Sequence, residues 1–133
     1  MPKTILLVDD SMLMLATVKA KLDLAGLFVR VEKAEDGVVA LAQIAAGLKP
    51  DLVITDMNMP NMGGLELVKG IRALPKLRFI PIIALTTESA AAKREEGKKN
   101  GVTAWIVKPA NTAELLAVIK YVLPGVARVA ARA

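Results

Sequence analysis

The stretch ILLVDDS, residues 5–11, decides how this sequence folds, because four apolar residues end abruptly on two aspartates and a serine. A short apolar run that is bounded by charge is typical of a strand buried on both faces of a parallel sheet. Residues 52–55, 82–85 and 104–107 repeat the pattern. A fifth run, residues 27–31, is more polar and is predicted to be an edge strand.

Segments of helical length separate these runs, and the predicted helices cover residues 12–25, 37–46, 65–74, 89–100 and 112–123. Ser11 is placed to cap the first helix and Gly26 to end it. Residues 16–24 alternate in a strand-like period, but the length and the two caps favour a helix. Strands that alternate with helices predict an α/β fold, in which helices cover both faces of a parallel sheet.

Length and composition predict one folded domain, since the chain has 133 residues of which 54% are hydrophobic. We assign residues 1–123 to this domain and residues 124–133 to a flexible C-terminal tail, because a proline and a glycine follow the last helix. A docking segment or the start of a linker are the alternatives for the tail. No apolar run approaches the roughly 18 residues of a membrane span, and no signal peptide is expected.

The absent residue types exclude several kinds of chemistry. Without cysteine there are no disulfides, thiol nucleophiles or Cys-ligated zinc sites, which fits a reducing cytoplasm. Without histidine the chain has no imidazole base and cannot itself donate phosphate from a phosphohistidine. The net charge of +5 comes with few aromatic residues, so nucleic-acid binding is not expected. Basic residues cluster loosely in 69–78 and 93–99; we interpret them as solvated faces, with an acidic partner surface as the alternative.

Polar residues stand where the predicted strands end: Asp9 and Asp10 after the first, Asp56 after the third, Thr86 at the fourth and Lys108 after the fifth. The carboxyl ends of parallel strands lie at one edge of a sheet, where such folds bind ligands. Clustered carboxylates repel one another unless a cation joins them. Oxygen ligands without histidine or cysteine suit Mg²⁺, or Mn²⁺ in its place.

The same residue types are suited to phosphoryl transfer. A lysine can hold a phosphoryl oxygen, and a carboxylate can accept a phosphoryl group as an acyl phosphate. The residues therefore suggest Mg²⁺-dependent phosphoryl transfer to an aspartate. The sequence has no glycine-rich phosphate loop of the GxxxxGK[ST] type, so nucleotide binding is disfavoured. Three methionines near Asp56 (Met57, Met59 and Met62) are interpreted as gap-filling residues rather than soft-metal ligands.

Four motifs, in this order, resemble the receiver domain of two-component response regulators: LLVDDS at 6–11, DMNMPNM at 56–62, LTTE at 85–88 and WIVKP at 105–109. The resemblance covers about residues 3–123 and is strongest toward the stand-alone chemotaxis regulators. It implies a doubly wound, flavodoxin-like sheet of five parallel strands in the order 2-1-3-4-5, with five helices on its two faces.

The resemblance also implies the roles of the site residues. Asp56 would be the phosphoacceptor. Asp10, Asp56 and the backbone carbonyl of Asn58 would bind Mg²⁺ directly, and Asp9 would hold a metal-bound water. Lys108 would contact the phosphoryl group.

A second group of residues would transmit or time the signal. Thr86 would close onto the phosphoryl group, and the aromatic residue, here Trp105, would swing inward on activation. Asn58, Thr87 and Glu88 would tune the phosphoryl lifetime, although Glu88 could equally be a first-turn residue favoured by the helix dipole. The Lys108–Pro109 bond would be cis.

The resemblance predicts a signalling switch rather than an enzyme with a separate substrate. Its donor would be the phosphohistidine of a sensor histidine kinase. Phosphorylation would change the face made by the fourth helix, the fifth strand and the fifth helix. That face would control a target such as a flagellar motor switch protein, and a phosphatase is a further candidate partner. The alternative function is a phosphate relay or sink with no output target. A cytoplasmic monomer that binds no membrane is expected.

Overall fold

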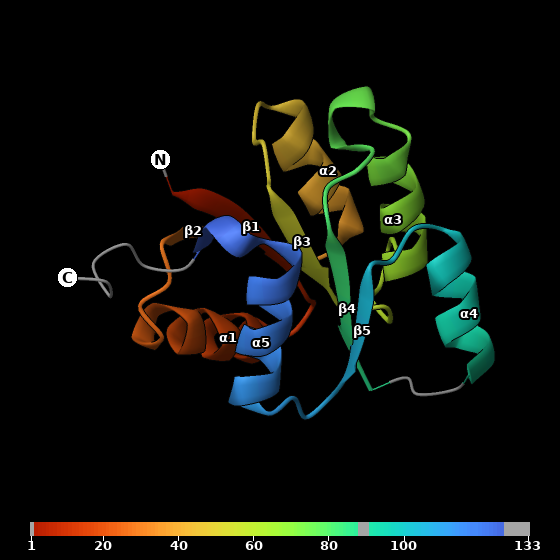
Figure 1. Cartoon of the computed structure of the whole chain (residues 1–133). Helices are drawn as coiled ribbons and strands as arrows, with labels where there is room; N and C mark the ends of the chain where they lie inside the picture. Colours follow the sequence, from red (N-terminus) through yellow and green to blue (C-terminus); the bar gives the residue numbers. More distant parts are fainter. Residues whose placement is uncertain (1, 88–90, 127–133) are drawn as a thin grey trace.

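A sheet of five parallel strands forms the centre of the computed structural model, which describes residues 2–87 and 91–126. The strands are Lys3–Val8 (β1), Val29–Ala34 (β2), Leu52–Thr55 (β3), Ile82–Thr86 (β4) and Ala104–Val107 (β5). Their order is β2-β1-β3-β4-β5, and every neighbouring pair is parallel (Figure 1). The predicted α/β fold and its strand order are therefore confirmed.

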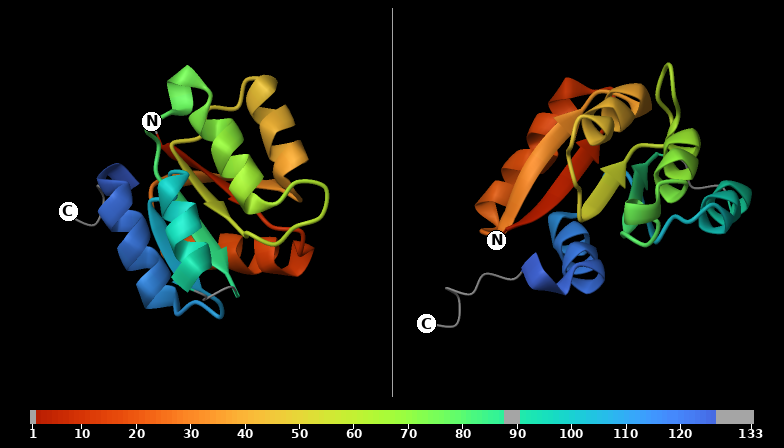
Figure 2. Two further views of the ribbon diagram at one scale, coloured as in Figure 1. Left: turned by 90° about the vertical axis from the view of Figure 1, so that its right-hand side faces the viewer. Right: turned by 90° about the horizontal axis from the view of Figure 1, so that it is seen from above.

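Five helices cover the two faces of this sheet. They are Met12–Leu24 (α1), Gly37–Ala45 (α2), Gly64–Arg72 (α3), Ala91–Lys99 (α4) and Thr112–Val122 (α5), with short 3₁₀ helices at Pro75–Leu77 (η1) and Pro124–Val126 (η2). α1 and α5 lie on one face, and α2, α3 and α4 lie on the other (Figure 1 and Figure 2). Among the described residues, no helix is both long and apolar enough to cross a membrane.

Side-chain caps place the start of three helices. The side chains of Ser11, Asp36 and Asn111 each accept a hydrogen bond from a backbone N–H two or three residues later, at the start of α1, α2 and α5. α1 ends at Leu24, and Gly26 follows it with φ of 68°, a backbone conformation that glycine adopts without strain. The predicted caps of α1 are thus present, and the ends of α1, α2, α3 and α5 differ from prediction by at most two residues. The predicted start of the fourth helix at residue 89 lies outside the described residues.

The strands alternate their side chains between two separate cores, which explains their unbroken apolar sequences. Ile5 and Leu7 contact the core beneath α1 and α5, whereas Leu6 and Val8 contact the core beneath α2 and α3. All four side chains are at most 2% exposed. A strand between two helical layers has no solvent-facing side, so its sequence shows no polar alternation.

Several strand boundaries differ from the predictions: β1 begins two residues earlier, at Lys3, and β4 includes Thr86. β2 begins two residues later than predicted, after Phe28, whose N–H donates to the Val126 carbonyl (2.8 Å), and it continues to Ala34, which pairs with Val8 of β1. β2 tolerates charged residues because it is an edge strand. Val126, predicted to lie in the flexible tail, is completely buried in the core beneath α1 and α5. The packed domain thus extends at least to Val126, and residues 127–133 lie outside the described part of the chain.

The basic cluster at residues 69–78 was interpreted as a solvated face, but Arg72 is not part of one. Its guanidinium donates hydrogen bonds to the carbonyls of Gly101 (2.7 Å), Leu77 (3.2 Å) and Arg78 (3.0 Å). Its partial burial lowers the pKa of this guanidinium. Arg72 therefore joins the end of α3 to the turns that precede β4 and β5.

The start of α3 lies directly against the end of β3. A Cβ atom at Gly64 would lie 2.7 Å from the Cα of Met57 and even closer to the carbonyl oxygen of Asp56. Both obstacles are backbone atoms, which cannot rotate away. Gly64 thus allows α3 to approach the residue that follows β3.

We expect Gly64→Ala to lower the free energy of unfolding by about 1–3 kcal/mol, the usual cost of forcing an atom into a packed region. Urea denaturation measures this change. Gly63→Ala is the matched control, because a Cβ there would meet its nearest neighbour at 3.4 Å, an ordinary contact distance. Its stability should stay within about 0.5 kcal/mol of the parent. Equal stabilities of the two variants would contradict this account.

Candidate functional site

The predicted site residues meet at the carboxyl edge of the sheet. The hydrogen-bonding pattern of the strands continues one residue further, since the backbone N–H groups of Asp9, Asp56 and Lys108 each donate to a neighbouring strand at 2.8–3.1 Å. The Lys108 Nζ atom lies 2.8 Å from Asp9 Oδ2 and 3.5 Å from Asp56 Oδ2. Residues far apart in the sequence thus form one ion-paired group.

Backbone amides orient the two buried carboxylates. Asp9 Oδ1 accepts a hydrogen bond from the Ser11 N–H (2.9 Å). Asp56 Oδ1 accepts from the N–H groups of Met57 (2.7 Å) and Asn58 (3.3 Å). In both residues one oxygen is thereby held by the following loop, and the other faces Lys108.

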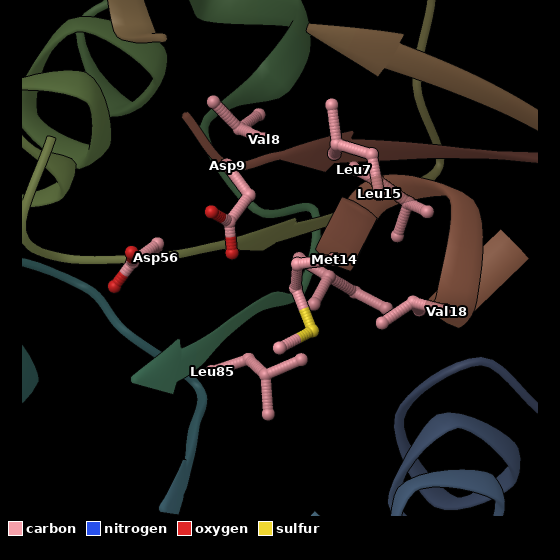
Figure 3. A pocket seen from close by; sticks show the side chains of 9 residues that line it. Leu7, Val8, Asp9, Met14, Leu15, Val18, Asp56 and Leu85 are labelled. Atoms are coloured by element: carbon pink, nitrogen blue, oxygen red, sulfur yellow. The ribbon is translucent and has the colours of Figure 1, made fainter. Parts of the chain in front are cut away.

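One side of the site is apolar. Asp9 and Asp56, which are 5% and 9% exposed, lie at one end of a small pocket whose other walls include Met14, Leu15 and Leu85 (Figure 3). Apolar walls keep water away from one side of these carboxylates, which strengthens electrostatic interactions at the site. A cation or phosphoryl group must therefore approach from the opposite, open side, where Asp10 is exposed.

The carboxylates fit a divalent cation. Asp9, Asp10 and Asp56 each offer one oxygen, and these atoms lie within 4.8 Å of one another. Three carboxylates against the single ammonium of Lys108 leave an excess of negative charge that a cation would offset. Oxygen ligands of which one is solvent-exposed suit Mg²⁺, which keeps several waters when bound. Asn58, whose carbonyl the resemblance adds to the ligands, lies in the loop directly after Asp56.

The residues predicted to transmit a signal border this group. Thr86 is completely buried at the end of β4, where it is paired with Val107 in the sheet. Thr87 follows it and is exposed, whereas Glu88 lies outside the described residues. The Lys108–Pro109 peptide bond is cis.

Trp105 is half-buried on β5 and contacts α4. A Cβ atom at Gly97 would lie only 3.0 Å from the indole Cζ3, so the indole ring packs against the backbone of α4. Within this helix Gly97 is the only buried residue. α4 therefore buries little surface and meets the sheet beside Trp105.

Trp105 also borders two hollows. A small one of about 70 Å³ is lined by residues that include Asn58, Lys93 and Glu96, and a larger one of about 560 Å³ runs between α4 and β5. The indole thus extends from the loop beside Asp56 to the outer face of α4.

Sequence reasoning missed two residues beside the site. Asp36 caps α2 with one carboxylate oxygen, and its second oxygen accepts a hydrogen bond from the Asn61 side-chain amide (2.9 Å). Asn61 has φ of 65°, a conformation that asparagine adopts more readily than most residues, and its place in a Pro60-Asn61 turn is the signal that could have drawn attention to it. Met57, Met59 and Met62 pack against the core beneath α2 and α3, as expected of gap-filling residues.

Comparisons with known proteins agree with this arrangement. The chain is 43% identical to the chemotaxis protein CheY1 of Helicobacter pylori over 105 residues, which cover 79% of this chain and 84% of that protein. The structure of the Vibrio cholerae chemotaxis protein CheY4 is similar with a TM-score of 0.85 and 42% identity, covering 92% of this chain and 100% of that one.

A third similar structure is the receiver domain of the sensor histidine kinase PA1611 from Pseudomonas aeruginosa, which holds a magnesium ion in its active-site cleft. Its TM-score is 0.81 and its identity 28%, and the match covers 93% of this chain and 99% of that one. The sequence family of response regulator receiver domains matches residues 5–120. With the strand order, the carboxylate group and these matches in agreement, the chain belongs to the response regulator receiver domain family.

Proposed function

We propose that this chain is a phosphorylation-controlled switch that accepts a phosphoryl group on Asp56 from the phosphohistidine of a sensor histidine kinase. The observation that supports this most is the position of Asp56. Its carboxylate is 9% exposed, lies 3.5 Å from the Lys108 ammonium and is grouped with two further carboxylates. Asp9 shares the lysine partner and the carboxylate group, and the resemblance of the motif at residues 56–62 assigns the acceptor role to Asp56.

In the proposed reaction an oxygen of Asp56 attacks the phosphorus atom, and the bond between phosphorus and the donor imidazole breaks. The imidazole nitrogen keeps the electron pair, and Asp56 becomes an acyl phosphate. The amides of Met57 and Asn58 hold the carboxylate so that one oxygen faces Lys108. Lys108 would then pair with the negative charge of the phosphoryl group.

The proposal assigns Mg²⁺ to Asp10, Asp56 and the Asn58 carbonyl, with Asp9 on a metal-bound water, and Mn²⁺ as a substitute. The carboxylate oxygens within 4.8 Å of one another support it, as does the magnesium ion bound by the related PA1611 domain. The metal supplies positive charge that offsets the repulsion between the carboxylates and the incoming phosphoryl group.

The proposed output surface is formed by α4, β5 and α5. Thr86 would close onto the phosphoryl group and draw on the start of α4, and Trp105 would move with it. α4 buries little, so it is among the elements that can rearrange at low cost. Asn58, Thr87 and Glu88 would tune how long the phosphoryl group persists.

The proposed pathway is chemotaxis, with a flagellar motor switch protein as target, a phosphatase as a further partner and the cytoplasm as location. Identities of 42–43% to chemotaxis proteins support the pathway. The alternative function is a phosphate relay or sink with no output target. This alternative is retained because a receiver domain that belongs to a histidine kinase is among the structural relatives.

Asp56→Asn should abolish phosphorylation by a small phosphodonor such as acetyl phosphate in the presence of Mg²⁺, because the amide cannot form an acyl phosphate. Intact-protein mass spectrometry counts the phosphoryl groups. Asp51→Asn, a change at the opposite end of the sheet, should leave labelling intact. Stoichiometric labelling of the Asp56 variant would show that another residue is the acceptor.

Mg²⁺ should raise the melting temperature of the parent chain, since a ligand that binds only the folded state stabilises it. Asp10→Asn should remove this Mg²⁺ effect. Without metal the same variant should be more stable than the parent by up to about 1 kcal/mol, because it removes one of three mutually repelling charges. The gain is small because Asp10 is exposed and solvent screens its charge. A parent chain whose melting temperature does not change when Mg²⁺ is added would argue against the metal site.

A phosphoryl mimic such as beryllofluoride, added with Mg²⁺, should change the fluorescence of Trp105, the only tryptophan, and speed or slow amide exchange in α4. Gly97→Ala should alter the starting emission, since its Cβ would press on the indole. Asp56→Asn serves as the control that should not respond to the mimic. Bound mimic without any change in emission or exchange would favour the relay or sink alternative.

A further inference from the structure

The loop between β3 and α3 needs support that its own sequence does not provide. Residues 57–63 carry the Asn58 carbonyl that the proposed metal site uses. The loop contains a tight turn, in which the Met62 N–H donates to the Pro60 carbonyl (2.6 Å). Asn61 within this turn has φ of 65°, which costs free energy for any residue with a side chain. Such a conformation persists only where neighbouring contacts hold it.

Those contacts come from the start of α2. Asp36 Oδ2 accepts a hydrogen bond from the Asn61 amide at 2.9 Å, while Asp36 Oδ1 accepts from the Val39 N–H at 2.9 Å and caps α2. Asp36 is 8% exposed, and both of its oxygens are used. The hydrogen bonds from Asn61 and from Val39 keep the pKa of Asp36 below its usual value, although burial alone would raise it.

A second contact lies directly beside the first. A Cβ atom at Gly37 would be 2.7 Å from Met62 Cγ, so the Met62 side chain lies on the backbone of Gly37. Two consecutive residues of the loop are thus held by two consecutive residues at the start of α2. Figure 2 shows the loop beside this helix.

The start of α2 is itself fixed relative to the candidate metal ligands. It follows β2, whose last residue, Ala34, accepts a hydrogen bond from the Asp9 N–H (3.1 Å). The segment from Ala34 to Asp36 therefore hydrogen-bonds both to Asp9 and to the Asn61 turn. Asp36 is placed to set the distance between the strand that carries Asp9 and the loop that follows Asp56.

We propose that Asp36 is a positioning residue for the metal site: by binding Asn61 it holds the 57–63 loop so that the Asn58 carbonyl is presented to Mg²⁺. This inference rests on the proposed metal site. Asp36 touches neither the metal nor the phosphoryl group, and it acts through the loop. Residues that hydrogen-bond directly to a metal ligand typically change affinity ten- to a hundredfold. Because Asp36 is further removed, we expect a change of about three- to tenfold.

Isothermal titration calorimetry with Mg²⁺ at neutral pH tests the proposal on four variants. Asn61→Gly removes the amide but keeps the positive φ accessible. Asp36→Ser keeps a cap for α2 but removes the second oxygen. Each should weaken Mg²⁺ binding about three- to tenfold. The double variant should bind within about twofold of either single variant, because the same contact is lost in all three.

Asp51→Ser is the matched control. Asp51 also accepts a backbone hydrogen bond, from the Thr4 N–H at 2.8 Å, but at the opposite end of the sheet. It should lower thermal stability and leave Mg²⁺ affinity unchanged. Parent-like affinity in both single variants, or additive losses in the double variant, would overturn the positioning role.

Amide hydrogen exchange without metal gives an independent result. Exchange in residues 57–63 should accelerate in Asn61→Gly and in Asp36→Ser, but not in Asp51→Ser. Unchanged exchange would contradict the proposed support of the loop. A parent chain that binds no Mg²⁺ at all would instead overturn the metal site, and the exchange measurement would still decide whether Asp36 holds the loop.

Discussion

The structure depends on holding like charges together at one edge of a sheet. Asp9, Asp10 and Asp56 bring three carboxylates within 4.8 Å of one another, and Lys108 compensates for only part of that charge. Such a group is unfavourable by itself, since like charges at this distance repel one another. Two buried cores beneath the sheet and hydrogen bonds that continue past the strand ends hold it in place. The stability of the fold thus holds these mutually repelling charges together.

Support for this site is unevenly distributed. On the side of α2 and α3, close contacts at Gly37 and Gly64 and the bond between Asp36 and Asn61 fix the loop that follows Asp56. On the side of α4, a helix with one buried residue meets the sheet chiefly through Trp105 and Gly97. A rigid side suits the binding of a metal and a phosphoryl group, whereas a lightly packed side suits a change of shape.

Several boundaries and roles could not be predicted from local sequence. β2 was predicted too early because residues 27 and 28 are apolar, yet Phe28 pairs with Val126 from the far end of the chain. Arg72 was assigned to a solvated cluster because it has charged neighbours, yet it binds three carbonyls, including that of Gly101. Both errors have one physical cause: tertiary contacts, such as those of Phe28 with Val126 and of Arg72 with Gly101, decide these roles, whereas hydrophobic patterns describe only near neighbours.

The sequence alone determined the class of fold and the residue types that gather at the site, because buried parallel strands impose apolar runs that end in polar residues. It therefore predicted that Asp9, Asp10, Asp56, Thr86 and Lys108 would share one edge. Only the tertiary structure decided which carboxylate oxygens face Lys108, that Trp105 rests on Gly97, and that Asp36 reaches Asn61. These contacts depend on where helices and loops lie to within about an ångström, because hydrogen bonds and close packing contacts form only over a narrow span of distances. Patterns in the sequence do not specify positions that finely.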